Sequence, residues 1–121
     1  MEKSLKSGDL ARFGEEEACR FLRKKGYRVL QRNFRCAKGE IDIIASSGKM
    51  IVFVEVKARS SANFAQPWEA VGFRKRKHLH ETAKFYILQN GIRDFEFRFD
   101  VLSIVVNNDL QAKIEWIQDA F

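Results

Sequence analysis

The sequence predicts an α/β fold in which two helices cover opposite faces of one central mixed β-sheet, giving three layers. Two helical patterns lie on either side of a pair of β-branched runs joined by a short Gly-containing link, which is typical of a β-hairpin. The second run, residues 50–58, is apolar on both faces, as expected of a central strand. Helices before and after such a hairpin can cover its two faces.

The first half of the chain is expected to form one helix and three strands. From Gly8 to Lys25, an apolar stripe of Ala11, Ala18 and Leu22 recurs at helical spacing, and Gly26 follows as a stop signal. Alternating or β-branched runs then predict strands over residues 27–33, 39–45 and 50–58.

The second half is expected to form another helix and two more strands. The helix runs from about Phe73 to Asn90, with Gly91 closing it. Its inward-facing residues are expected to be Leu79, Ala83, Tyr86 and Ile87. Strands follow over residues 95–106 and 113–117, and the length of 121 residues suits a single domain spanning 1–121.

The predicted hairpin brings together charged residues that an apolar strand normally excludes. If Gly48-Lys49 form a two-residue loop, residues whose numbers sum to 97 face each other. Asp42 then lies opposite Glu55 with Cβ atoms about 5 Å apart, and Lys57 shares the face of Glu55. Unpaired buried charges cost several kcal/mol, so the three need a common reason to lie there. One reason is an ion pair of Lys57 with either carboxylate, and the other is a functional site.

A third carboxylate, Glu15, lies on the inward stripe of the first helix, between Ala11 and Ala18. It joins Asp42 and Glu55 as a candidate ligand, or it pairs with a nearby arginine at the edge of the stripe. Three converging carboxylates should repel one another without a metal ion, so one is expected to titrate high.

Basic residues gather just downstream of this candidate site. The net charge is +6, from 22 Lys and Arg against 16 Asp and Glu, and residues 74–77 are four consecutive basic positions. As phosphate contacts they would bind nucleic acid without reading sequence; as the solvated start of a helix they would have no partner. Their position favours contacts with a polyanion by Arg59, Arg74, Lys75 and Lys77, above all Lys75 and Arg59.

Several motifs along the chain closely resemble one known family. They are Gly14-Glu15-x-x-Ala18, Gly26-Tyr27, Gly39-Glu40-Ile41-Asp42 and Phe53-Val54-Glu55-Val56-Lys57-x-Arg59. In these motifs the chain resembles the YraN-type family of uncharacterised bacterial proteins, within the PD-(D/E)XK nuclease superfamily and near the Holliday-junction resolvases. The chain departs from the family pattern at Ile41, where the superfamily has Pro, at Gly72-Phe73, and at Trp116, where members often have His.

The resemblance implies a restriction-endonuclease-like fold and a metal-dependent endonuclease that hydrolyses phosphodiester bonds in DNA, with branched or structured DNA favoured. Mg²⁺, with Mn²⁺ as an alternative, suits Asp42 and Glu55 because it prefers carboxylate oxygens, and the resemblance adds the Val56 carbonyl as a ligand. Glu15 would hold a second ion or a water, and Lys57 would orient the attacking water and offset negative charge. Resolvase-like enzymes usually pair, which implies a homodimer as one option. The alternatives are a catalytically silent nucleic-acid-binding module and a protein-assembly factor on the same fold.

Other features carry narrower expectations. No apolar run approaches 18 residues and no secretion signal is seen, so a cytoplasmic protein without membrane contact is expected. Cys19 and Cys36 are expected to be free thiols. Asp100, inside a strand, is expected to make a structural hydrogen bond to a neighbouring loop. Phe64 and Trp68 form either a flap over DNA or a packed loop.

Overall fold

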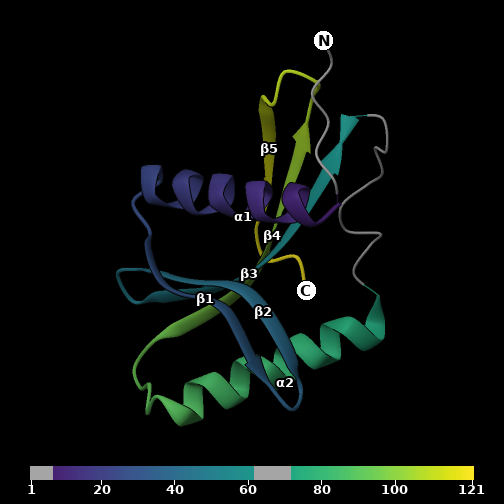
Figure 1. Cartoon of the computed structure of the whole chain (residues 1–121). Coiled ribbons are helices and arrows are strands. Elements are labelled where there is room, and N and C mark those ends of the chain that lie inside the picture. Colours follow the sequence, from purple (N-terminus) through teal and green to yellow (C-terminus); the bar gives the residue numbers. More distant parts are fainter. Residues whose placement is uncertain (1–6, 62–71) are drawn as a thin grey trace.

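The computed structural model describes residues 7–61 and 72–121 and has an α/β fold (Figure 1). Its elements are α1 (Ser7–Lys24), β1 (Arg28–Cys36), β2 (Gly39–Ser47), β3 (Met50–Ser60), α2 (Phe73–Gln89), β4 (Glu96–Val106) and β5 (Ala112–Ile117). The strands form one mixed sheet in the order β1-β2-β3-β4-β5, in which only β3 and β4 are parallel. The predicted central position of β3 is therefore confirmed.

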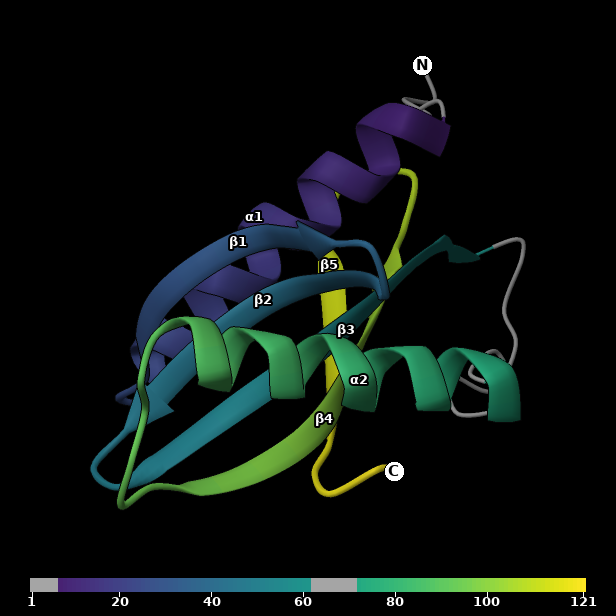
Figure 2. The same ribbon diagram turned by 90° about the horizontal axis from the view of Figure 1, so that it is seen from below.

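The two helices lie on opposite faces of this sheet, α1 above it and α2 below it in Figure 1, while α2 crosses in front of the strands in Figure 2. Each face has its own core. Val52 and Val54 of β3 pack with the α1 side, and Ile51 and Phe53 pack with the α2 side. The buried helical residues are Ala18, Cys19 and Leu22 of α1 and Leu79, Ala83 and Tyr86 of α2. The alternation predicted for β3 and the inward face of the second helix are confirmed.

Most element boundaries agree with the prediction to within a residue or two, with β1 as the main difference. It continues to Cys36, three residues beyond the predicted end, because its backbone goes on pairing with β2 as far as the Cys36–Gly39 pair. Ala11, which was expected on the buried stripe of α1, is exposed. It faces a hollow between α1 and β3 and not the core.

The β2–β3 hairpin has the predicted register, from Ser47–Met50 to Ile43–Val54. The predicted next pair, Asp42 with Glu55, is not formed as a backbone pair, because the two strands separate there. Beyond this fork, β2 continues paired with β1 and β3 continues paired with β4 as far as Ser60.

Close approaches of the backbone hold the two arms of the fork to different helices. A Cβ added to Gly39, at the tip of the β1–β2 hairpin, would lie 3.0 Å from Thr82 Oγ1 of α2. A Cβ added to Gly14 of α1 would lie 2.5 Å from the Cβ of Ala58 in β3. Figure 1 accordingly shows the β1–β2 tip beside α2, and the C-terminal half of β3 running toward the side of α1. Within the part of the chain described, neither helix has the combination of length and apolar character needed to cross a bilayer.

Candidate functional site

Asp42 lies at the point where β2 and β3 separate. Its Oδ2 atom accepts a hydrogen bond of 2.8 Å from the backbone N–H of Val56. The side-chain carboxylate thus binds a backbone N–H of β3 beyond the last backbone pair between β2 and β3. The alternation of β2 breaks at the same residue, because Ile41 and Ile43 on either side of it belong to different cores. The packing of the fork therefore holds Asp42 in a partly buried position between the two faces of the sheet.

The Asp42 carboxyl group keeps its proton to a higher pH than an ordinary aspartate does. Burial and, after it, the negative charge of Glu55 raise its pKa from 3.8 to about 7, against the opposing hydrogen bond from Val56. This confirms the expectation that one carboxylate of the group titrates high. It also indicates that the Asp42 and Glu55 carboxylates interact although the strands no longer pair there.

Glu55 is 6% exposed, and two lysines share one of its oxygens. The Nζ atoms of Lys75 and Lys57 lie 2.8 Å and 3.6 Å from Glu55 Oε1. Burial lowers the pKa of Lys57, partly offset by the charge of Glu55. Burial also acts to lower the pKa of Lys75, but the hydrogen bond and charge of Glu55 outweigh it and raise that pKa. The ion pair of Glu55 with Lys57 that the sequence suggested is present, and Lys75, expected to contact substrate, reaches the same carboxylate.

Two hollows of about 250 Å³ each open at the fork, and Asp42 lines both. The hollow on the α2 side is lined by Gly39, Glu40, Asp42, Glu55, Lys75, His78 and Leu79. The hollow on the α1 side is lined by Leu10, Ala11, Glu15, Asp42, Val56, Lys57 and Ala58. The structure therefore gathers all the predicted catalytic residues around Asp42, but it distributes them over two openings.

Glu15 is directed mainly to an arginine, as the alternative interpretation of the sequence proposed. Its Oε1 atom accepts hydrogen bonds of 2.9 Å from Arg32 Nε and of 2.9 Å from Asn33 Nδ2. Across residues 7–61 and 72–121, no three His, Cys, Asp or Glu side chains form a cluster that could hold a metal ion. Glu15 shares the hollow on the α1 side with Asp42, but its carboxylate is bonded to Arg32 and Asn33 and does not join Asp42 and Glu55 in such a cluster.

The other predicted nucleic-acid contacts lie on α2 and β3. Arg74 and Lys77 are exposed on the first turns of α2, and Arg59 is half-buried near the end of β3. Phe64 and Trp68, the predicted flap residues, lie outside the described residues. Cys19 and Cys36 are free thiols, as expected.

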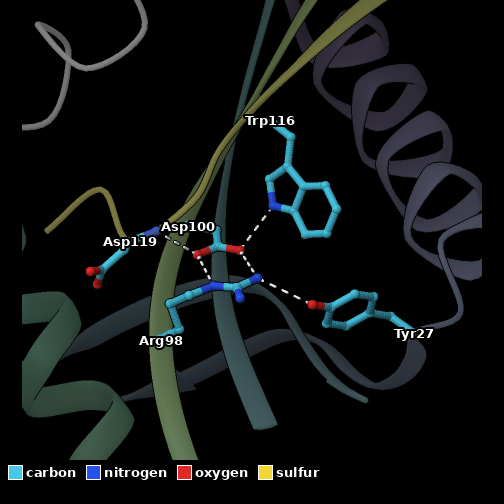
Figure 3. Close-up of polar contacts among 5 residues, drawn as sticks. All are labelled: Tyr27, Arg98, Asp100, Trp116 and Asp119. Atoms are coloured by element: carbon cyan, nitrogen blue, oxygen red, sulfur yellow. Dashed lines mark hydrogen bonds and ion pairs between the residues drawn. The ribbon is translucent and has the colours of Figure 1, made fainter.

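Asp100 is the centre of a structural network and not a ligand of the site (Figure 3). It is fully buried, and its carboxylate accepts hydrogen bonds from Arg98, from the Trp116 indole and from the backbone N–H of Asp119, at 2.7–2.9 Å. Arg98 also donates to the Tyr27 hydroxyl at 3.2 Å, so the network joins β4, β5, the turn after β5 and the link between α1 and β1. The expected hydrogen bond to a neighbouring loop is confirmed.

The partners of Asp100 were not found from the sequence, although two signals pointed toward them. A buried charge in an apolar strand requires a partner, and Arg98 is two residues away on the same face. Trp116 stands where the resemblance expects His, and its indole N–H donates to Asp100 as an imidazole N–H could.

The fold and the site define the chain as an α/β protein with a carboxylate and lysine site at a fork in its sheet. It belongs to the uncharacterised protein family UPF0102, also called the YraN family, whose model matches residues 14–104. The UPF0102 protein of Caldicellulosiruptor saccharolyticus is 46% identical over 93% of this chain and 97% of its own length. Those of Clostridium acetobutylicum and Alkaliphilus metalliredigens are each 43% identical, over 96% and 95% of this chain and 93% and 99% of their own lengths.

Proposed function

We propose that this protein is a metal-dependent endonuclease of the restriction-endonuclease-like class that hydrolyses phosphodiester bonds in DNA. The observation that carries the proposal is the meeting of Asp42, Glu55 and Lys57 at the β2–β3 fork, beside two open hollows. An apolar sheet centre excludes such charges unless they have partners or a ligand. The preference for branched or structured DNA, and for a homodimer that places two sites on two strands, comes from the family resemblance.

The donor set at the fork suits a hard divalent cation such as Mg²⁺ or Mn²⁺. Mg²⁺ binds through one or two carboxylates together with water and phosphate oxygens, and Asp42 and Glu55 supply the two carboxylates. Burial and, after it, the negative charge of Glu55 raise the pKa of Asp42, and a cation beside the carboxylates would offset both effects. Asp42 and Glu55 would hold the ion, with the Val56 carbonyl as the third ligand that the resemblance implies. A bound ion supplies Lewis-acid stabilisation of the charge that develops on the phosphate.

The remaining residues would act on the water and on the charge of the reacting phosphate. Lys57 lies on the face of Glu55 with only 19% of its side chain exposed, so it would hold the attacking water and donate to the developing negative charge. Glu15 lines the hollow on the α1 side and would hold a further ion or a water there after giving up part of its contact with Arg32.

The start of α2 supports a polyanionic substrate. A helix N-terminus is the positive end of the helix dipole, so cationic side chains there are unfavourable by themselves. Residues 74–77 nevertheless place four consecutive cations in the first turns, with no acidic residue in the first turn. Phosphate groups would benefit from both the side chains and the helix N-terminus. We therefore assign Arg74, Lys75 and Lys77, together with Arg59, to contacts with the DNA backbone.

The test is a cleavage panel of duplex, single-stranded, flap and four-way-junction DNA with Mg²⁺ and with Mn²⁺. The wild-type protein is expected to cleave at least one of these substrates. Glu55→Ala should abolish cleavage while DNA binding persists, and Glu115→Ala, which removes an exposed carboxylate of β5, should leave cleavage unchanged. Absence of cleavage of every substrate by folded wild-type protein, or cleavage that survives Glu55→Ala, would refute the proposal.

One observation favours a second candidate, a nucleic-acid-binding module without turnover. Glu55 already has two ammonium partners and Glu15 already has Arg32, so the charges at the fork are partly neutralised without a metal. Such a module would bind DNA with a steep salt dependence, because each phosphate contact releases counterions, and it would nick no substrate in the panel.

A further inference from the structure

Two lysines reach the same oxygen of Glu55, but they are held differently. Lys57 belongs to β3, where its backbone is paired with Ser103 of β4, and its side chain is 19% exposed. Lys75 belongs to the first turn of α2, and its side chain is 44% exposed although its Nζ atom is the closer of the two, at 2.8 Å against 3.6 Å. Lys75 therefore makes the shorter contact with Glu55, although its side chain is the more exposed of the two and the freer to move away.

A metal ion would make the fork strongly positive. With both carboxylates ionised, as metal ligands must be, Asp42 and Glu55 carry two negative charges, and Lys57 and Lys75 carry two positive charges. A divalent cation between the carboxylates would leave an excess of two positive charges in a partly buried site, which low-dielectric surroundings disfavour. One ammonium group has to move away when the ion enters, and the exposure of the two lysines indicates which one.

We infer that Lys75 is a resident counter-ion of Glu55, which leaves this carboxylate when a divalent cation binds and then contacts a phosphate of the substrate. The inference deepens the proposed function and rests on it. The movement is confined to the long side chain, because α2 itself is held in place where Gly39 of the β1–β2 hairpin approaches His78 and Thr82. Arg74 and Lys77 are exposed on the same turns of the helix, so the released ammonium would join the surface that we assign to DNA.

The same ion pair would serve the protein before substrate arrives. While Lys75 neutralises Glu55, the buried carboxylate has a hydrogen-bonded partner and the site is stable without metal. Binding of the ion and release of Lys75 are then one coupled event, which links occupation of the metal site to the positive charge offered to a phosphate.

The test measures Mn²⁺ binding to the full chain without nucleic acid, by electron paramagnetic resonance or calorimetry. Lys75→Met removes the counter-ion and keeps the length of the side chain, so the Kd for Mn²⁺ should fall about fivefold or more. Lys84→Met is the matched control, because it removes the same charge from an exposed position further along α2, and its Kd should stay within about twofold of the wild-type value. Glu55→Gln should weaken Mn²⁺ binding strongly, and adding Lys75→Met to Glu55→Gln should give a smaller gain than Lys75→Met gives in the wild-type protein.

A folded Lys75→Met protein that binds Mn²⁺ no more tightly than the wild type would overturn the inference, as would Mn²⁺ binding detected in neither protein. An equal gain from Lys84→Met would also overturn it, because the effect would then be a general one of net charge. If melting curves show that Lys75→Met is unfolded, Lys75→Gln is measured in its place under the same criteria.

The proposed nuclease activity and the proposed counter-ion role of Lys75 can be refuted independently of each other. Tighter Mn²⁺ binding by Lys75→Met, with no cleavage of any DNA, would support the counter-ion and refute the nuclease. Metal-dependent cleavage by the wild type, with an unchanged Mn²⁺ affinity in Lys75→Met, would support the nuclease and refute the counter-ion.

Discussion

Replacing Asp42 by Asn is expected to stabilise the metal-free protein at alkaline pH and to have less effect in acid. The folded-state pKa of Asp42 is raised to about 7 from 3.8, by burial and by the charge of Glu55. Well below pH 4 the carboxyl group is protonated in both the folded and the unfolded chain, so it has no effect on the free energy of unfolding. As the pH rises toward 7, only the unfolded chain ionises, so the free energy of unfolding falls, and above pH 7 the full cost applies.

The size of this effect follows from the pKa difference of about 3, at about 1.4 kcal/mol for each pKa unit, which gives an upper value of about 4 kcal/mol. Glu55 shares the interaction and relaxation of the site reduces it, so we expect a gain of about 2 kcal/mol at pH 8. The Asn side-chain oxygen can still accept the hydrogen bond from Val56, which keeps the geometry of the fork.

The assay is urea unfolding in the presence of EDTA at pH 5 and pH 8, followed by circular dichroism. The advantage of Asp42→Asn over wild type should be larger at pH 8 than at pH 5, by about 1–2 kcal/mol. Asp109→Asn, at an exposed position in the β4–β5 turn, is the control and should change stability by less than about 0.5 kcal/mol at either pH. A loss of more than about 2 kcal/mol at pH 8 would show instead that Asp42 belongs to a structural ion pair.

Two further predictions concern the packing around the site. Asp100→Asn should lower the free energy of unfolding by about 3 kcal/mol in urea titrations, because it removes the charge of a fully buried carboxylate that is paired with Arg98; a change below about 1 kcal/mol would contradict the structural role of the network. Gly14→Ala should be less stable than Gly8→Ala by about 1–3 kcal/mol, since a Cβ at Gly14 would lie 2.5 Å from that of Ala58 while nothing lies within 4 Å of one at Gly8. Both glycines lie in α1, so equal melting temperatures of these two variants would show that the helix and β3 can move apart without cost.

The hairpin shows how much of the site local sequence can predict. The β-branched runs and the short loop gave the correct register, and the alternation of side chains placed Ile51 and Phe53 on one face and Val52 and Val54 on the other. From this alternation Glu55 and Lys57 were expected on one face, and their ion pair is present. These predictions succeeded because a strand alternates with a period of two, which consecutive residues carry by themselves.

The fork could not be predicted in the same way. Nothing in the residues around Ile41 and Asp42 signals that the pairing of β2 with β3 ends there. The packing of Gly39 against α2 and of Gly14 against β3 holds the two strands apart beyond that point. For the same reason the position of Glu15 on its helix was predicted correctly, whereas the choice between a metal site and Arg32 was not decided.

By itself, the sequence determined the order of helices and strands, the two-sided burial of β3 and the identity of the acidic and basic residues near its end. Only the tertiary structure decided that β2 and β3 separate at Asp42, that Lys75 reaches Glu55 and that Asp100 joins Arg98 and Trp116. The physical reason is that helical and strand periodicity depend on neighbouring residues, whereas the partner of a buried charge is set by how distant segments pack against one another.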